Sequence, residues 1–297
     1  MTLNASIKNN NTFLSKACFV KYQGKYTTLC FFLFLISFST VSYCASKQEI
    51  LLGSVAMDKP AIMYKRLSPL TTYLSERLGL PVSLKLSPNM GAAINEIASN
   101  SVDIAYLTPV AYLKANEKGN AQIIAKTVTK GKASFKLMVV VKEDSPIKSI
   151  RDLAGKSFAF GDKRALLQRA ALVGGGMPLK KLGSYEFIGH YDKIANGVMA
   201  GYYDAGILKD TMAYKWENKG LRILYSTPDL PPYNISVNGI IDSDLKKKIK
   251  SSFLELNGSN PNHLKVIRAL DPKYNGFADT NDAEYDVVRK LIKPFTK

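Results

Sequence analysis

The sequence contains few cysteines and few histidines. Among its 297 residues there are three cysteines and two histidines, and the cysteines lie within the first 44 residues, at Cys18, Cys30 and Cys44. A chain cleaved near Cys44 would keep no thiol, and with two histidines it lacks the usual ligands of a zinc site. We expect neither disulfide bonds nor thiol catalysis, and no metal or other cofactor.

Sequence motifs of common enzymes are also missing. The chain has no Gly-x-Ser-x-Gly elbow, and its glycine run, Gly174–Gly176, follows a predicted helix rather than preceding one. Because a phosphate-binding loop must stand before its helix, we interpret this run as a helix stop. Asp103 and Asp204 stand near predicted strand starts rather than as a pair in one pocket. We therefore expect no enzymatic activity, although turnover in a metabolite screen would support an enzyme on the same scaffold.

Acidic residues are absent from residues 1–26, which contain four lysines and precede an apolar run at 29–41. This run is shorter than the roughly 20 residues of a membrane-spanning helix, and small residues follow it near Cys44. The layout predicts a signal peptide over residues 1–46 and a periplasmic protein. A lipid anchor on Cys44 is an alternative, but Tyr43 stands where a lipobox has a small residue.

Acidic residues are outnumbered in the whole chain. There are 41 lysines and arginines against 24 acidic residues, a net charge of +17; without the four leader lysines, 37 against 24 leaves +13. Positive charge favours anionic partners, although an ordinary solvated surface has the same composition. A binder of nucleic acid or membrane surfaces is a rival interpretation, and it predicts affinity that falls steeply with salt. We expect no nucleic-acid partner.

The remaining chain alternates short apolar runs with segments of helical periodicity. A strand at 49–56 precedes a helix at 61–78, and a strand at 82–86 precedes a helix at 92–98. This alternation of strands and helices predicts an α/β protein with a mostly parallel sheet. We predict that strands recur up to 234–237 and that the chain after residue 244 is helical.

Residues 158–169 combine a short apolar strand, a Gly-Asp turn and a helix, for which we predict Asp162 as N-cap. The first turn of such a helix presents N–H donors and partial positive charge, and Arg164 would add a full charge. The arrangement is typical of an anion site, although any strand-to-helix turn in an α/β protein looks similar. Thr108 followed by Pro109 predicts a second helix N-terminus.

Two similar segments indicate an internal repeat. Residues 100–105 and 200–206 each follow a predicted short helix, and each begins a strand with an aspartate, Asp103 or Asp204. The match is short, and chance resemblance is the alternative. A true repeat predicts two successive α/β lobes with a cleft between them.

Aromatic and polar residues follow several predicted strands, at the edge where open α/β sheets bind ligands. We predict ligand contacts from Tyr106, Tyr233 and His190 on this basis. Lys209 and Asp210 follow another strand, where one would contact the ligand and the other would cap the next helix. The alternative for His190 is a hydrogen-bonded histidine within a turn.

The order of several segments resembles the phosphate/phosphite/phosphonate substrate-binding proteins of ABC transporters. The similarity covers most of residues 50 to 270, and its matching segments are Val102–Ala105, Lys142–Pro146, Asp152–Asp162, Gly189–His190 and Asp204–Gly206. It implies a type II periplasmic-binding-protein fold, with two α/β lobes, a hinge of two crossings and a ligand held in the cleft by helix N-termini. We expect residues 47–138 and 238–297 to form lobe I, and residues 139–237 to form lobe II of a monomer.

The sequence departs from the family pattern where the family holds its phosphonate. The resemblance implies a Ser-Thr-Ser run at positions where this chain has Ala165, Leu166 and Leu167, so that either Arg164 replaces the hydroxyls or the ligand differs. His190 matches the family's ligand histidine. Two pocket tyrosines of the family correspond to Met90 and Phe135, and its ammonium-binding carboxylates correspond to Thr211 and Tyr233. The resemblance therefore implies a ligand with a small anionic head and an apolar body.

We predict a solute-binding protein that binds a small anion and delivers it to an inner-membrane ABC permease. A ligand sensor that acts on a kinase, with the same fold, is the nearest alternative. The predicted ligand-binding residues are Met90, Tyr106, Thr108, Phe135, Arg164, Ala165, Leu166, His190, Lys209, Asp210, Thr211 and Tyr233.

Overall fold

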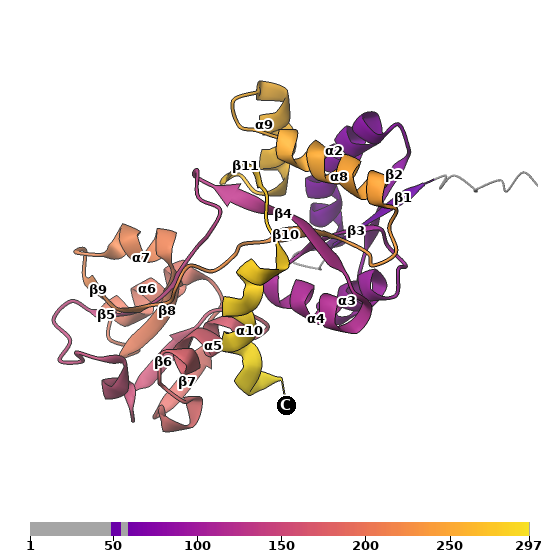
Figure 1. Cartoon of the computed structure of the whole chain (residues 1–297). Helices are drawn as coiled ribbons and strands as arrows, with labels where there is room; N and C mark the ends of the chain where they lie inside the picture. The colour runs from indigo at the N-terminus through magenta and orange to yellow at the C-terminus, as the bar shows by residue number, and fades with distance from the viewer. Residues whose placement is uncertain (1–48, 55–58, 297) are drawn as a thin grey trace, which may run out of the picture. The chain divides into compact units, whose positions relative to one another are not determined.

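Two mixed β-sheets with helices packed on them form the frame of the protein (Figure 1). The structure is a computed structural model that describes residues 49–54 and 59–296. The predicted signal peptide, its cleavage region and Cys44 lie outside the described residues. Residues 47–297 form one compact unit.

The first sheet has six strands in the order β11-β4-β10-β3-β1-β2, and the second has five in the order β7-β6-β8-β5-β9. The strands of the first sheet are β1 (Ile50–Ser54), β2 (Val82–Leu86), β3 (Ile104–Leu107), β4 (Gln122–Thr129), β10 (Asn234–Val237) and β11 (Tyr274–Ala278). Those of the second are β5 (Leu137–Lys142), β6 (Ser157–Phe160), β7 (Ser184–Phe187), β8 (Ala205–Lys209) and β9 (Leu221–Ser226).

The helices connect these strands or follow them. They are α2 (Pro60–Leu78), α3 (Met90–Ala98), α4 (Pro109–Gly119), α5 (Leu166–Gly174), α6 (Tyr191–Met199), α7 (Asp210–Trp216), α8 (Ser243–Glu255), α9 (Pro261–Leu270) and α10 (Asp286–Ile292). No helix in the described ranges is long and apolar enough to cross a bilayer.

The two sheets repeat one topology, which explains the internal repeat in the sequence. In each sheet three parallel strands, β2-β1-β3 or β7-β6-β8, continue into two antiparallel strands, β10-β4 or β5-β9. The two aspartates of this repeat, Asp103 and Asp204, have equivalent roles. The carboxylate of Asp103, before β3, accepts a hydrogen bond from Leu51 N of β1 at 2.8 Å, and that of Asp204, before β8, accepts one from Ser157 N of β6 at 2.8 Å.

The chain passes between the sheets twice, from β4 to β5 and from β9 to β10. The two passing segments pair with each other, because Phe135 and Leu230 exchange backbone N–H···O hydrogen bonds of 2.9 and 2.8 Å. The boundaries predicted for the lobes fall close to these segments, but residues 234–237 pair with β3 and β4 of the first sheet. The exact division into lobes therefore stays a prediction.

Helix α10, at the yellow end of the chain, lies beside α5 of the second sheet (Figure 1). The contact is close, since a Cβ placed on Gly174 would lie 2.4 Å from Cδ2 of Leu291. The segment just before α10 contacts α4 of the first sheet, where Tyr112 donates a hydrogen bond to Asp282 at 2.5 Å. The end of the chain is thus in contact with elements that follow both sheets.

Most predicted elements are confirmed, and the strands at 82–86 and 234–237 have the predicted bounds. The region after residue 244 is not all helical, because Tyr274–Ala278 forms β11 on the edge of the first sheet. This strand is short and contains Gly276, so its local sequence gives little strand signal. Its formation depends on pairing with β4, more than 140 positions earlier in the chain.

Candidate ligand-binding site

Three tyrosines of the first sheet form a buried group. Tyr106 of β3 stacks on Tyr233, which precedes β10, with ring centroids 5.2 Å apart and an interplanar angle of 29°. The hydroxyls of Tyr106 and Tyr274 lie 2.8 Å apart and share a hydrogen bond. Burial raises the pKa of Tyr106 well above its ordinary value and also raises the pKa of Tyr233, so both hydroxyls are neutral hydrogen-bonding groups at neutral pH. The group offers flat apolar surface with hydroxyls at its edge.

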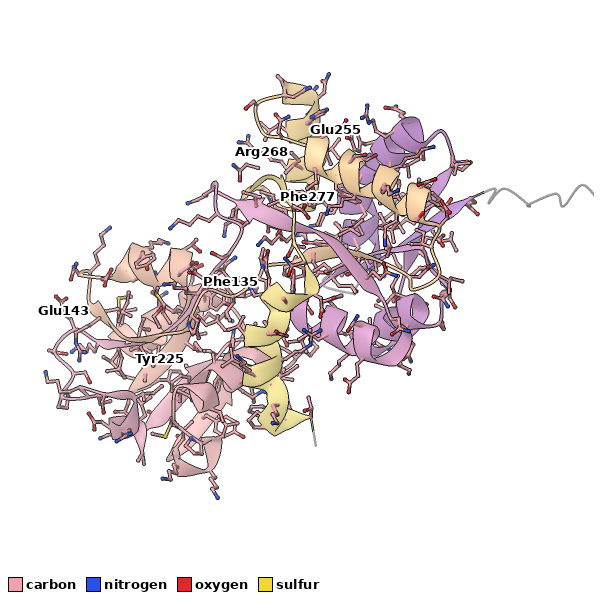
Figure 2. The ribbon with its side chains drawn as sticks, viewed as in Figure 1. Phe135, Glu143, Tyr225, Glu255, Arg268 and Phe277 are labelled. Atoms are coloured by element: carbon pink, nitrogen blue, oxygen red, sulfur yellow. The ribbon has the colours of Figure 1, made fainter. Side chains whose placement is uncertain are left out.

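Lys209 occupies the carboxyl end of β8, in the second sheet. Its Nζ lies 4.9 Å from the centroid of the Phe135 ring, which comes from the segment between β4 and β5 (Figure 2). Burial lowers the pKa of Lys209; Asp210 and Asp271 oppose this shift and Lys273 adds to it. Within the described residues no carboxylate lies within 4.0 Å of Nζ, so the nearest recorded partner of this cation is an aromatic ring.

Asp271, at the end of α9, links the tyrosine group to Lys209. Its charge raises the pKa of Tyr106, Tyr233 and Tyr274, and it also acts on the pKa of Lys209. Leu137 pairs with Lys209 in the second sheet, and Phe135 pairs with Leu230, three residues before Tyr233, so the tyrosine group and Lys209 lie in the same region. We call these five residues, with Phe135, the tyrosine–lysine cluster.

A second polar contact joins the ends of β6 and β7. The buried Gln168 of α5 accepts a hydrogen bond from Gly161 N at 2.7 Å and donates one to the hydroxyl of Tyr191 at 3.3 Å. A side chain at position 161 would be blocked, because a Cβ there would lie 2.8 Å from Gln168 Nε2 and 2.9 Å from Gly189 O. Burial raises the pKa of Tyr191, to which the charge of Asp210 contributes, so Tyr191 lies near the start of α7.

The prediction that Asp162 caps the helix after β6 is wrong. Helix α5 begins at Leu166, and its N-cap residue, Ala165, makes no side-chain capping bond. The Asp162 carboxylate accepts instead from Arg164 N at 2.8 Å and pairs with the Arg164 guanidinium at 2.6 Å. An aspartate that bonds the backbone two residues ahead stabilises a turn, and this turn competes with the helix. The Arg164 side chain is 73% exposed and its charge is already paired with a carboxylate.

Other predicted residues stand at helix starts. Thr108 caps α4 as predicted, accepting from Ala111 N at 3.2 Å, and Met90 is the first residue of α3. His190 is exposed and precedes α6, where it makes no side-chain capping bond. Asp192 lies within the first turn of this helix.

Asp210 and Thr211 begin α7. The Asp210 carboxylate accepts hydrogen bonds from Lys136 N at 3.1 Å and from Thr211 N at 2.6 Å, and the Thr211 side chain is exposed. This carboxylate therefore fastens the start of α7 to the residue before β5.

The structure brings together part of the predicted set. Tyr106, Tyr233, Phe135 and Lys209 belong to the tyrosine–lysine cluster. Over the described part of the chain, no hydrogen bond, ion pair or ring contact joins Arg164 to this cluster, and its recorded side-chain partner is Asp162.

Sequence reasoning missed several residues in or beside the cluster. They are Gln168, Tyr191, Tyr274 and Asp271. Tyr191 follows His190 directly at a predicted strand end, so the rule that singled out His190 also applied to it. Tyr274 belongs to the unpredicted strand β11, and Gln168 lies within a helix that was predicted to start earlier. Among the residues that the structure describes, no group of three His, Cys, Asp or Glu side chains is placed to hold a metal ion.

A family model for the phosphonate periplasmic substrate-binding proteins of ABC transporters matches residues 52–285. The chain belongs to this family. It is 27% identical over 125 residues to a phosphonates-binding periplasmic protein of Escherichia coli, a match that covers 40% of this chain and 37% of that protein. It is 22% identical to the phosphate-import protein PhnD of Mycolicibacterium smegmatis, with 82% of this chain and 85% of that protein covered.

The fold agrees with solved structures of the family. PhnD1 from Prochlorococcus marinus, solved in complex with methylphosphonate, superposes with a TM-score of 0.64 at 19% identity, covering 84% of this chain and 99% of that one. The protein thus has the two-lobed α/β fold of periplasmic binding proteins, as the resemblance implied. Its family consists of periplasmic substrate-binding proteins that serve ABC transporters, not of enzymes.

Proposed function

We propose that this protein binds a small phosphonate- or phosphate-like anion in the periplasm and delivers it to the permease of an ABC transporter. Residues 1–46 would direct its export as a signal peptide, and the mature protein would act as a monomer. The proposed site centres on the tyrosine–lysine cluster. Further contacts proposed from the sequence pattern or from the family resemblance are those of Met90, Thr108, Arg164, Ala165, Leu166, His190, Asp210 and Thr211.

The observation that carries the proposal is the position of the cluster relative to the repeated sheets. Tyr106 and Lys209 lie at the carboxyl ends of β3 and β8, where open α/β sheets bind ligands. Phe135 and Tyr233 lie on the two segments that pass between the sheets. Aromatic rings provide apolar contact and the lysine provides positive charge, which together suit an organic anion.

Calorimetric titration with inorganic phosphate and a series of n-alkylphosphonates tests the binding step. We expect saturable binding of at least one of these anions, and we expect Tyr233→Ala to weaken it by about tenfold, as for loss of a stacked aromatic contact. Tyr202→Ala is the control, because Tyr202 is 79% exposed and lies outside the cluster. Absence of binding to every member of the panel would overturn the proposed ligand class.

Growth on the bound anion as sole phosphorus source tests the delivery step. Cells without the gene should fail to take up the labelled anion, and the wild-type gene should restore uptake while the Tyr233→Ala gene restores less. Normal uptake without the gene would contradict a transport role.

A further inference from the structure

Lys209 occupies a position where a lysine is unfavourable for folding. It is the N-cap residue of α7, where its side chain makes no capping hydrogen bond. Lysine is a poor N-cap residue because it has no acceptor, and a cation at a helix N-terminus faces the positive end of the helix dipole. Partial burial adds a desolvation cost, which also lowers the pKa of Lys209.

At the equivalent position in the first sheet, the residue caps its helix with a side-chain hydrogen bond. Thr108 stands five residues after Asp103, as Lys209 stands five residues after Asp204, and each precedes the first residue of a helix. Thr108 caps its helix with its hydroxyl, whereas Lys209 does not. The repeated fold therefore does not require a lysine here.

Another poorly exposed lysine shows how such a charge is normally compensated. The side chain of Lys126 is 14% exposed and forms an ion pair with Glu284. Lys209 instead has the Phe135 ring, and in the described ranges no carboxylate completes an ion pair with it. An anionic group of a ligand would add to this compensation.

We propose that Lys209 selects the ligand by charge, favouring phosphonates or phosphate esters with an uncharged organic group over those that carry an ammonium group. This inference rests on the proposed function and adds to it the class of substituent that the site accepts. The Lys209 ammonium attracts the anionic head, and the rings of Phe135, Tyr106 and Tyr233 contact an apolar body. A ligand ammonium in the same site would be repelled by Lys209.

Charged groups of both signs act on Lys209. Two acidic side chains face it, Asp210 of α7 and Asp271 at the end of α9, and Lys273 adds a further positive charge. Both carboxylates already accept backbone hydrogen bonds, Asp210 from Lys136 N and Asp271 from Lys273 N at 2.8 Å. Both carboxylates are therefore fastened to the protein backbone, and in the described ranges neither forms an ion pair with Lys209.

A matched pair of ligands tests the inference. n-Propylphosphonate and 2-aminoethylphosphonate have almost the same size and differ in a terminal methyl against an ammonium group. Calorimetry on the purified protein should give tighter binding of n-propylphosphonate by about tenfold or more. Lys209→Met keeps the length of the side chain without its charge, and it should weaken n-propylphosphonate binding by about ten- to hundredfold while removing most of the preference.

Lys215→Met provides the matched control. Lys215 lies on the same helix with its Nζ 5.1 Å from the centroid of the Trp216 ring, but it pairs with Asp192 and is 56% exposed. This variant should keep the affinity and the preference of the wild type. Lys209→Glu should reverse the preference, and melting curves of all variants confirm that they are folded.

The outcomes separate this inference from the proposed function. Binding of n-propylphosphonate with the same affinity and preference in wild type and Lys209→Met would overturn the role of Lys209 and leave the proposed function intact. Tighter binding of 2-aminoethylphosphonate by the wild type would overturn the charge selection. A wild-type protein that binds neither compound nor any other phosphonate or phosphate would refute both.

Discussion

The paired aspartates of the repeat allow a direct test of how each sheet is held together. Asp103 is 2% exposed, and its carboxylate accepts from Leu51 N at 2.8 Å and from Asn238 Nδ2 at 3.1 Å. Asp204 is exposed, and its carboxylate accepts from Ser157 N and Ser157 Oγ, both at 2.8 Å. The two carboxylates thus make equivalent bonds at very different depths.

Replacement by alanine should therefore have unequal costs. In Asp103→Ala, the Leu51 N–H loses its partner in the interior, while the Asn238 amide keeps its bond to Val102 O at 3.1 Å. An unsatisfied buried donor costs about 1–3 kcal/mol, and lost packing and the weakened amide add to this, so we expect about 2–4 kcal/mol. In Asp204→Ala, water replaces the carboxylate, and we expect about 0.5–1.5 kcal/mol.

Denaturant unfolding followed by circular dichroism measures both costs from the shift of the midpoint at unchanged slope. Asp204→Ala is the matched control for Asp103→Ala, since each removes one carboxylate from the start of an equivalent strand. Equal losses of stability, or a larger loss for Asp204→Ala, would refute the argument from burial. A changed slope would show that the variant alters the unfolding reaction itself, and comparison would then use hydrogen exchange at Leu51.

Three further results are expected. If the ligand contacts Arg164, Arg164→Ala should weaken anion binding in calorimetry by about ten- to hundredfold, and Arg164→Lys should recover part of the affinity. Unchanged affinity would exclude Arg164 from the site. Because the ion pair of Arg164 with Asp162 is exposed, we expect little change in melting temperature. Anion affinity should be highest below the lowered pKa of Lys209 and should fall as pH rises through that pKa, because the Lys209 side chain of the free protein loses its charge. The same fall with pH in Lys209→Met would contradict this. Gly174→Val should lower stability by about 1–3 kcal/mol in thermal unfolding, because the valine side chain would clash with Leu291. If this clash causes the loss, adding Leu291→Ala should restore part of the stability, and no recovery in the double variant would contradict the explanation.

Signals contained within a few residues were sufficient to predict many parts of the fold. The Thr108 cap carries its donor and acceptor within four residues. Pro60 at the first turn of α2 and the left-handed Gly79 at its end also act locally. Such features depend on backbone geometry that is the same in any fold, so the sequence alone predicts them.

Features that depend on distant partners were not predictable in the same way. Asp162 had two local options, a helix cap and a turn with Arg164, and the chain adopts the turn because the helix begins only at Leu166. The start of α5 is in turn linked to Gly161 through Gln168, which also bonds Tyr191 of another helix. The choice between cap and turn was therefore made by packing across the ends of two strands, which no short window of sequence contains.

The repeat also shows how the candidate site acquires two chemically different ends. Thr108 and Lys209 occupy equivalent positions after Asp103 and Asp204, so the topology alone would give the two sheets the same strand ends. The sequences differ at this point, with a helix-capping hydroxyl in one sheet and a partly buried cation in the other. In the proposed site, a ligand between equivalent strand ends with unequal charge would bind in one orientation, its anionic head toward Lys209. The proposed site is thus asymmetric because the residues differ at equivalent positions of a repeated topology, and we expect a change of charge at Lys209 to alter ligand preference without altering the fold.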